Sequence, residues 1–150
     1  FKEVSDMAEF YDLSRYTRAH RDNYARALSE IRAGRKTSHW MWYIFPQLQG
    51  LGRSDTSRYY ALKGLEEARA FLADPVLGRN LLEICRALLA LPTDSALEVL
   101  GAPDNLKLRS SMTLFAQADQ GNPIFPAVLD KFFGGRPDAK TLALLGLPPR

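Results

Sequence analysis

Hydrophobic residues recur every three or four positions near the start of the chain, which is the period of an amphipathic helix. This spacing predicts a helix over residues 12–33, with Gly34 as its C-terminal stop. A dense aromatic stretch follows almost at once. It is expected to form a short helix that ends before Pro46, with Thr37 or Ser38 as its cap, because their hydroxyls accept hydrogen bonds from the free N–H groups of a first helical turn.

The rest of the chain shows the same helical period and few alternating stretches of the kind that form strands. Residues 57–62 are ambiguous between a strand and a helical turn. Further helices are predicted over 65–72, from 76 to about 91, from a cap at 93–95 through 100, and over 104–118, 125–133 and 139–145. The sequence therefore predicts a single, mainly α domain over residues 1–150, a compact fold of about eight helices with little or no β-structure.

The stretch from 38 to 48 is the most aromatic part of the chain and holds both tryptophans, Trp40 and Trp42. Its side chains can form the centre of a hydrophobic core. Alternatively, Trp40, Trp42 and Tyr43 can form a wall against which a planar ring of a ligand stacks. His39, beside this apolar run, is more typical of a structural histidine than of a catalytic base. The stretch therefore predicts a core, a ligand-binding wall, or both.

The predicted helix over 104–118 turns polar residues toward the core. Its apolar residues form two rows, Leu108, Met112 and Phe115 in one and Leu114 and Ala118 in the other. Asp104, Lys107 and Ser111 fall between these rows. Because isolated charges are costly in a core, two interpretations follow. Either Asp104 and Lys107 form an ion pair while Ser111 bonds back to its own helix, or the three residues line a pocket in which Lys107 acts as an acid, a nucleophile or an oxyanion partner.

Composition narrows the class of protein. The chain is 46% hydrophobic and 25% charged, which is ordinary for a globular protein, and no apolar run approaches the roughly 20 residues of a membrane-spanning helix. The first residues carry acidic side chains and lack the apolar core of a signal peptide. A single cysteine, Cys85, excludes an intrachain disulfide and fits a reducing compartment. A cytoplasmic protein without a membrane segment is therefore expected.

Familiar catalytic and metal-binding patterns are missing from the sequence. With Cys85, His20 and His39 as the only soft ligands, a structural zinc ion is not expected. The fingerprints of dinucleotide-binding, kinase and EF-hand proteins are absent, as is a Ser-His-Asp or Cys-His arrangement of recognisable spacing. No metal and no cofactor are therefore predicted, and the sequence does not indicate an oligomeric state.

Basic residues gather in the segment from 15 to 36, where seven cations face only Asp22 and Glu30. The net charge of the whole chain is +3. A local excess of this kind could meet a phosphate-bearing ligand or a nucleic acid, or it could be a solvated helix face. Both interpretations stay open.

Three motifs of the chain resemble one bacterial family, which is filed as domain of unknown function eighteen-ten and is sometimes mislabelled calpastatin. The motifs are residues 34–48 (GRKTSHWMWYIFPQL), 104–115 (DNLKLRSSMTLF) and 129–135 (LDKFFGG). This resemblance implies a small, mostly helical, cytoplasmic protein and brings no activity with it.

A more distant resemblance is to the YbiA-like superfamily, which is associated with NAD and ADP-ribose. Residues 37–40 are similar to the Ser-Glu-His-Tyr helix start of those proteins, although the glutamate is absent here, and Lys107 is similar to their inward lysine. The resemblance implies cleavage of an N-glycosidic bond in a nucleotide or an ADP-ribosyl derivative.

Two hypotheses of function follow. The first is an N-glycosidase-like hydrolase in which the tryptophans stack the base, the arginines hold phosphate and the serines position ribose hydroxyls. Its candidate residues are Lys107 and Asp104 for catalysis, and His39, Trp40, Trp42, Tyr43, Arg53, Arg58, Ser110 and Ser111 for ligand binding. The alternative is a non-catalytic module that binds a nucleotide, a nucleic acid or a protein.

Overall fold

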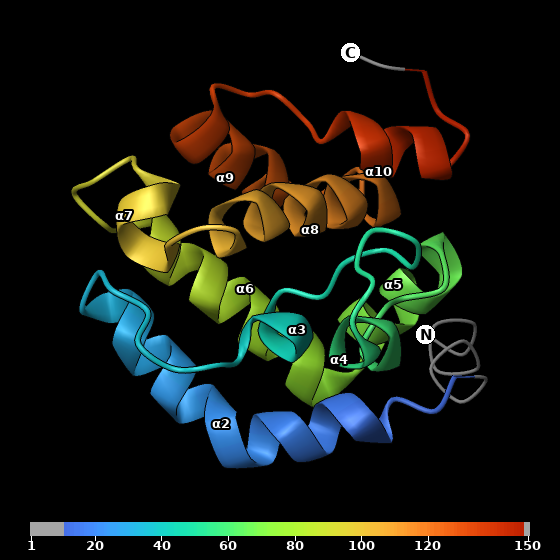
Figure 1. Cartoon of the computed structure of the whole chain (residues 1–150), viewed down its shortest axis with the longest axis horizontal. Helices are drawn as coiled ribbons and strands as arrows, with labels where there is room; N and C mark the ends of the chain where they lie inside the picture. The colour runs from blue at the N-terminus through green and yellow to red at the C-terminus, as the bar shows by residue number, and fades with distance from the viewer. Residues whose placement is uncertain (1–10, 149–150) are drawn as a thin grey trace.

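The computed structural model describes residues 11–148, so the acidic first residues and the end of the chain lie outside the described part. The described residues form nine helices, α2 to α10 (Figure 1). Their bounds are α2 Ser14–Arg32, α3 Met41–Ile44, α4 Asp55–Tyr59, α5 Leu65–Ala73, α6 Pro75–Leu89, α7 Ala96–Leu100, α8 Asp104–Ala118, α9 Ile124–Phe133 and α10 Ala139–Leu144.

Helices α6 and α8 organise the packing. Helix α6 contacts α2, α5 and α9, and helix α8 contacts α5, α7, α9 and α10. In Figure 1, α2 runs along one side of the molecule and α9 and α10 lie on the opposite side, while the short helices α3 and α4 lie between α2 and α8. The largest fully buried side chains come from five different parts of this arrangement and form one core: Tyr16, Trp40, Phe45, Phe71, Phe115 and Phe125.

The junction between α5 and α6 shows how local sequence sets the packing of these two helices. The carboxylate of Asp74 accepts hydrogen bonds from the N–H groups of Val76 and Leu77, at 2.9 and 3.0 Å, and thereby caps α6. One turn later, Gly78 lies against the backbone of Leu72, and a Cβ atom at position 78 would come within 3.0 Å of the Leu72 carbonyl carbon. Glycine is therefore required for the close approach of α6 to the end of α5.

The prediction of a mainly helical fold is confirmed. The predicted helix over 104–118 coincides with α8, and the predicted helix over 12–33 contains α2. Residues 57–62 combine both predicted conformations, since α4 ends at Tyr59 and Leu62 forms an isolated parallel bridge with Leu48. The pairing of Leu62 with Leu48, the last residue of the aromatic stretch, favours the extended conformation at the end of this segment.

The predicted cap of the short aromatic helix is wrong. Helix α3 begins at Met41, and neither Thr37 nor Ser38 caps it through its side chain. The hydroxyl of Ser38 instead donates a hydrogen bond to the carboxylate of Glu30. The Ser38 hydroxyl, which the sequence pattern predicts as a cap of α3, therefore binds a charged acceptor on α2 instead.

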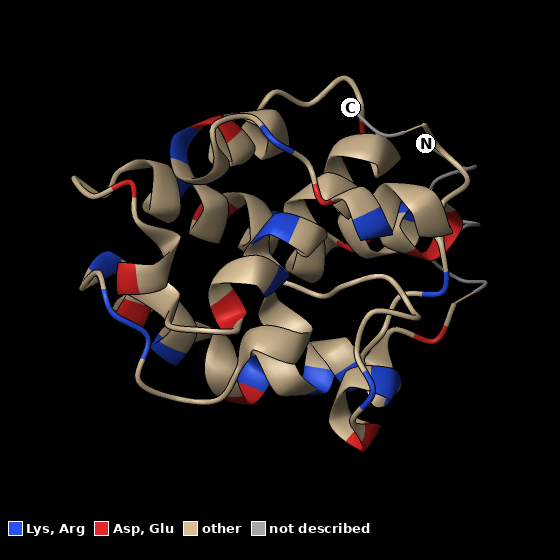
Figure 2. Ribbon diagram, turned by 45° about the horizontal axis from the view of Figure 1, so that its top comes forward, with Lys and Arg blue, Asp and Glu red and all other residues tan. Residues whose placement is uncertain are grey.

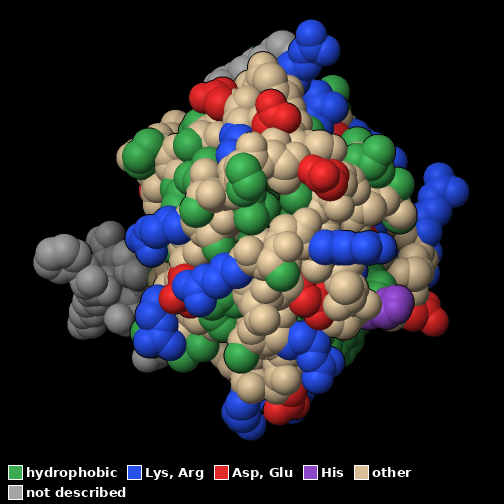
Figure 3. Space-filling model, turned by 90° about the vertical axis from the view of Figure 1, so that its left-hand side faces the viewer, with side chains coloured by type: hydrophobic (Ala, Val, Ile, Leu, Met, Phe, Trp, Pro, Cys, Tyr) green, Lys and Arg blue, Asp and Glu red, His purple; other side chains and the backbone are tan. Residues whose placement is uncertain are grey.

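Charges of both signs cover the surface of the molecule. Lys and Arg are spread along several helices, α2 among them (Figure 2), and on the face shown in Figure 3 they alternate with acidic and hydrophobic side chains. Among residues 11–148, no helix has both the length and the apolarity that a membrane crossing requires, and no three His, Cys, Asp or Glu side chains gather as metal ligands would. Cys85 is buried, and burial raises the pKa of its thiol.

Candidate functional site

A carboxylate held between two lysines is the main polar cluster at the start of α8. The carboxylate of Asp104 forms ion pairs with the ammonium of Lys36, at 2.9 Å, and with that of Lys107, at 3.5 Å. The side chains of Lys36, Asp104 and Lys107 are 10%, 17% and 23% exposed. The cluster thus lies at the edge of the core, where its three charged groups still reach solvent.

Two elements bring these residues together. Asp104 and Lys107 occupy the first turn of α8, three positions apart, so that they share one face of the helix. Lys36 belongs to the loop after α2, and its backbone N–H donates to the carbonyl of Val99 in α7 at 2.7 Å. Since α7 packs on α8, this hydrogen bond places the Lys36 side chain over the start of α8.

The aromatic stretch meets the same cluster. The ammonium of Lys107 lies 5.4 Å from the centre of a Trp42 ring, and that of Lys36 lies 5.2 Å from the centre of a Trp40 ring. Both distances are within the range of a cation–π contact. Trp40 is 1% exposed and serves the core, whereas Trp42 is only partly buried. Trp40 therefore belongs to the core, and part of the Trp42 side chain stays accessible from the surface.

Glu30 of α2 fixes the loop that carries Lys36. Its carboxylate accepts hydrogen bonds from the backbone N–H groups of Thr37 and Ser38 at 2.7 and 3.0 Å, from the Ser38 hydroxyl, and from the indole N–H of Trp40 at 2.9 Å. Burial raises the pKa of Glu30, but the hydrogen bonds outweigh it and lower the pKa to about 2. Glu30 is therefore a charged anchor for the loop.

The serines of α8 differ in what they contact. The hydroxyl of Ser110 donates to the carbonyl of Leu106 at 3.1 Å, a bond within its own helix. Ser111 is 0% exposed, and its hydroxyl has no hydrogen-bond partner among the described residues. The same holds for the side-chain oxygen of Asn105. The prediction that Ser111 turns inward is confirmed, whereas the bond back to its own helix, expected for the ion-pair interpretation, is absent among the described residues.

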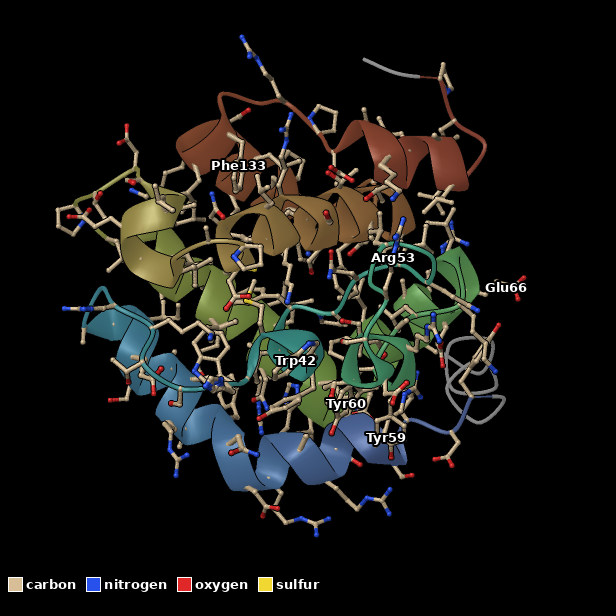
Figure 4. All side chains as sticks on the ribbon, in the orientation of Figure 1. Trp42, Arg53, Tyr59, Tyr60, Glu66 and Phe133 are labelled. Atoms are coloured by element: carbon tan, nitrogen blue, oxygen red, sulfur yellow. The ribbon has the colours of Figure 1, made fainter. Side chains whose placement is uncertain are left out.

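The other predicted ligand-binding residues lie on neighbouring elements. His39 is exposed, and its carbonyl accepts a hydrogen bond from the hydroxyl of Tyr43 at 3.3 Å. Tyr43 is 7% exposed, so it belongs mainly to the core. Arg53 is exposed on the loop before α4 (Figure 4). Arg58 is exposed within α4 and lines a cavity together with Arg15 and Arg18 of α2.

Sequence reasoning missed two residues of the site, Lys36 and Glu30. Both lie in the segment from 15 to 36, which the sequence marks only by its charge, although Lys36 is also part of the motif 34–48. Lys36 lies two residues before the aromatic stretch, and this position is the signal that points to it. No local pattern connects Lys36 with Asp104, because their contact joins a loop to a helix far along the chain.

The comparisons with known proteins agree with this fold. Residues 10–145 match the model of a family described as "Protein of unknown function (DUF1810)". The chain belongs to this family. The crystal structure of the conserved hypothetical protein Rv1873 from Mycobacterium tuberculosis is similar, with 45% identity and a TM-score of 0.89 over 92% of this chain and 99% of that one. No curated protein matches the chain significantly.

The family membership predicted from the three motifs is thereby confirmed. Two of these motifs, 34–48 and 104–115, carry the cluster of Lys36, Asp104, Lys107 and Trp42. The family description names no activity. The resemblance to the YbiA-like superfamily stays a prediction, and so do the roles of the predicted site residues.

Proposed function

We propose that this member of the DUF1810 family binds a small nucleotide or ADP-ribosyl derivative at the Lys36–Asp104–Lys107 cluster and hydrolyses its N-glycosidic bond. The observation that carries the proposal is one carboxylate bridged by two ammonium groups beside the partly buried Trp42. The lysines can bind an anion, Trp42 can stack on a planar ring, and Asp104 can act at a sugar carbon.

Charge and shape favour an anionic ligand with a ring. The two lysines and Asp104 leave a formal charge of +1. Each ammonium has three N–H donors, so neither lysine is saturated by its contact with Asp104, and phosphate oxygens can accept from both. Trp42 offers an aromatic surface on which a base can stack. Ser111, with its unpaired hydroxyl one turn beyond Lys107, extends the polar side of the cluster inward.

The same groups can serve the reaction. When the bond between the sugar carbon and the base nitrogen breaks, positive charge develops on the sugar, and the carboxylate of Asp104 stabilises it. Where the base would otherwise leave as an anion, Lys107 donates a proton to the departing nitrogen, whereas the nicotinamide of NAD leaves neutral and needs none. Water adds to the sugar carbon while Asp104 accepts the proton that the water loses. Where Lys107 has given up its proton, transfer of the proton from Asp104 to Lys107, 3.5 Å away, restores both groups. The products are the free base and the sugar with a hydroxyl group.

A second candidate function is ligand binding without catalysis. The observation in its favour is that both ammonium groups already neutralise Asp104. The two lysines of the cluster can still bind a phosphate-bearing ligand. The paired carboxylate of Asp104, however, has less negative charge left to stabilise a positive charge that develops on the sugar. The cluster then binds the ligand through the charges of its lysines and does not hydrolyse the N-glycosidic bond.

Three variants separate these functions: Asp104→Asn, Lys107→Met and the control Lys140→Met, which removes an exposed lysine of α10. We expect Asp104→Asn to retain ADP-ribose binding, which is measured by the quenching of tryptophan fluorescence. Base release from NAD should fall at least about 100-fold, the usual scale for the loss of a general acid–base group. Lys107→Met should weaken binding about tenfold, as the loss of a charge-assisted contact does. Lys140→Met should behave as the unchanged protein.

The possible results lead to different conclusions. If the unchanged protein binds ADP-ribose and releases no base from NAD or from nucleotides, the non-catalytic function is supported and the hydrolase is refuted. If neither ADP-ribose nor any nucleotide binds, both are refuted. If Lys107→Met unfolds the protein, Lys107→Arg keeps the charge but cannot give up its proton, so it should still bind ADP-ribose while base release from nucleotides falls.

A further inference from the structure

A second polar site lies outside the cluster, in a cavity between the start of α2, helix α4 and the connection that leads into α5. Its volume is about 410 Å³. Four cationic side chains line it, Arg15, Arg18, Arg58 and Lys63, against two carboxylates, Asp12 and Glu67. The lining therefore carries a formal charge of +2. Neither Lys107 nor Trp42 lines this cavity.

Arg15 is part of the wall and holds it together. Its guanidinium donates to the carbonyls of Tyr59 and Ala61, at 2.8 and 3.1 Å, and to the carbonyl of Asp12 at 2.9 Å. It also pairs with Glu67 at 3.4 Å, and Glu67 accepts the backbone N–H of Lys63 at 2.9 Å. The charge of Glu67 is thus compensated by Arg15, and the backbone around the cavity is fixed before any ligand arrives.

The remaining cations are available to a ligand. The side chains of Arg18, Arg58 and Lys63 are exposed and make no hydrogen bond or ion pair with any residue between 11 and 148. Asp12, the other acid, accepts the backbone N–H of Ser14 at 2.9 Å. Ser14 is the first residue of the 19-residue helix α2 and also lines the cavity, so the positive end of the helix dipole faces it.

We propose that this cavity binds the phosphate group of a small molecule, held by Arg18, Arg58 and Lys63. A guanidinium presents two parallel N–H donors that match two phosphate oxygens. Tyr59, which is 54% exposed, stands at the edge of the cavity and offers its ring to the rest of the ligand (Figure 4). The confined volume favours a small molecule over a nucleic acid, which needs a groove or a surface along which several phosphates are bound.

The experiment uses inorganic pyrophosphate as the probe and the full chain as the protein. Binding is measured by calorimetry and located by amide chemical shifts. The test variants are Arg18→Gln and Arg58→Gln. The matched control is Arg26→Gln, an exposed arginine two turns further along α2 that does not line the cavity. Lys107→Met tests for binding at the other site, and Lys140→Met, at an exposed lysine of α10, is the second control.

We expect the dissociation constant to rise about tenfold or more in Arg18→Gln and in Arg58→Gln, since each loses a charge-assisted contact. Arg26→Gln and Lys140→Met should stay within about twofold of the unchanged protein. The amide signals that move on titration should be those of residues 14–18 and 61–63. Circular dichroism checks that each variant is folded, and the two test variants, from different helices, serve as independent trials.

Several results would overturn the proposal. Equal weakening in all three arginine variants would mean that the probe responds to overall charge. Loss of binding in Lys107→Met alone would place the probe at the Asp104 cluster. A single-stranded oligonucleotide that binds more tightly than pyrophosphate, with Arg26→Gln as harmful as Arg18→Gln, would show a nucleic-acid surface instead. Because base release is not measured, failure of this cavity leaves the hydrolase test untouched.

Discussion

Replacing Glu30 with alanine should release the loop that carries Lys36 and destabilise the protein by about 2–3 kcal/mol. In the variant the indole N–H of Trp40 loses its acceptor, and Trp40 is 1% exposed, so water cannot replace Glu30 easily. An unpaired buried donor costs about 1–3 kcal/mol. The backbone N–H groups of Thr37 and Ser38 lie nearer to solvent, and their loss adds about 1 kcal/mol or less.

The pKa of Glu30 gives a second measure of the same effect. It is lowered from 4.5 to about 2, because hydrogen bonds from Ser38, Thr37 and Trp40 outweigh the cost of burial. A difference of this size corresponds to about 3 kcal/mol when fully expressed, and to about 2 kcal/mol once solvent screening of the partly exposed carboxylate is allowed for. The folded protein binds the proton less tightly than the unfolded chain, so this stabilisation is complete above pH 4.5 and is lost as the pH falls toward 2.

Urea unfolding, followed by tryptophan fluorescence, measures the free energy of unfolding at neutral pH and at about pH 3. Glu30→Ala should lose about 2–3 kcal/mol at neutral pH and clearly less in acid. Glu30→Gln keeps one acceptor oxygen without the charge and should fall between. Glu98→Gln, an exposed acid of α7, is the control and should change little. A loss below about 0.5 kcal/mol in Glu30→Ala, or one that is the same at both pH values, would refute the anchoring role of Glu30.

Two further predictions concern the core. His20 donates from Nε2 to the carbonyl of Tyr43 at 2.8 Å and accepts at Nδ1 from the Asn80 amide at 3.0 Å, so the ring is neutral. Burial lowers its pKa below 6.5, and stability should therefore be highest above pH 6.5 and decrease below it; His20→Gln should flatten this dependence in thermal unfolding between about pH 5 and pH 7.5, and an unchanged slope would contradict the assignment. Gly78→Ala should cost more than about 2 kcal/mol in urea unfolding, because the new Cβ meets the Leu72 carbonyl. The control Gly64→Ala, where a Cβ meets nothing within 4 Å, should cost far less, and similar losses in both would refute this explanation.

The helices could be predicted from the sequence because their signals are local. The helix predicted over residues 104–118 follows from the period of its apolar residues, and it coincides with α8. The cap of α3 could not be predicted in this way. Ser38 has the chemistry of a cap, but Glu30 offers its hydroxyl a charged acceptor, and that contact exists only after the loop has folded back on α2.

The candidate site could be predicted only where its residues follow a local pattern. The inward face of α8 follows from its period, so Asp104, Lys107 and Ser111 were found. The contact between Trp42 and Lys107 joins the aromatic stretch to this face, although aromatic character alone does not predict which cation a ring meets. Lys36 was missed because its place depends on two long-range contacts, its own hydrogen bond to Val99 and the anchoring of its loop by Glu30. Neither contact leaves a periodic pattern.

The exposure of the Asp104 cluster bears on the two interpretations that its sequence pattern left open, an ion pair or the lining of a pocket. A fully buried ion pair would be costly to break, because the remaining charge would stay unpaired in the core. Asp104 and Lys107 form the ion pair, yet their side chains are 17% and 23% exposed. A partly exposed pair contributes about 1 kcal/mol or less, so solvent or a ligand can replace either partner at small cost. The pair is therefore compatible with a binding site, and Lys107→Met should leave stability almost unchanged while it alters ligand binding. A large loss of stability in that variant, without any effect on ligand binding, would show that Lys107 serves the fold alone.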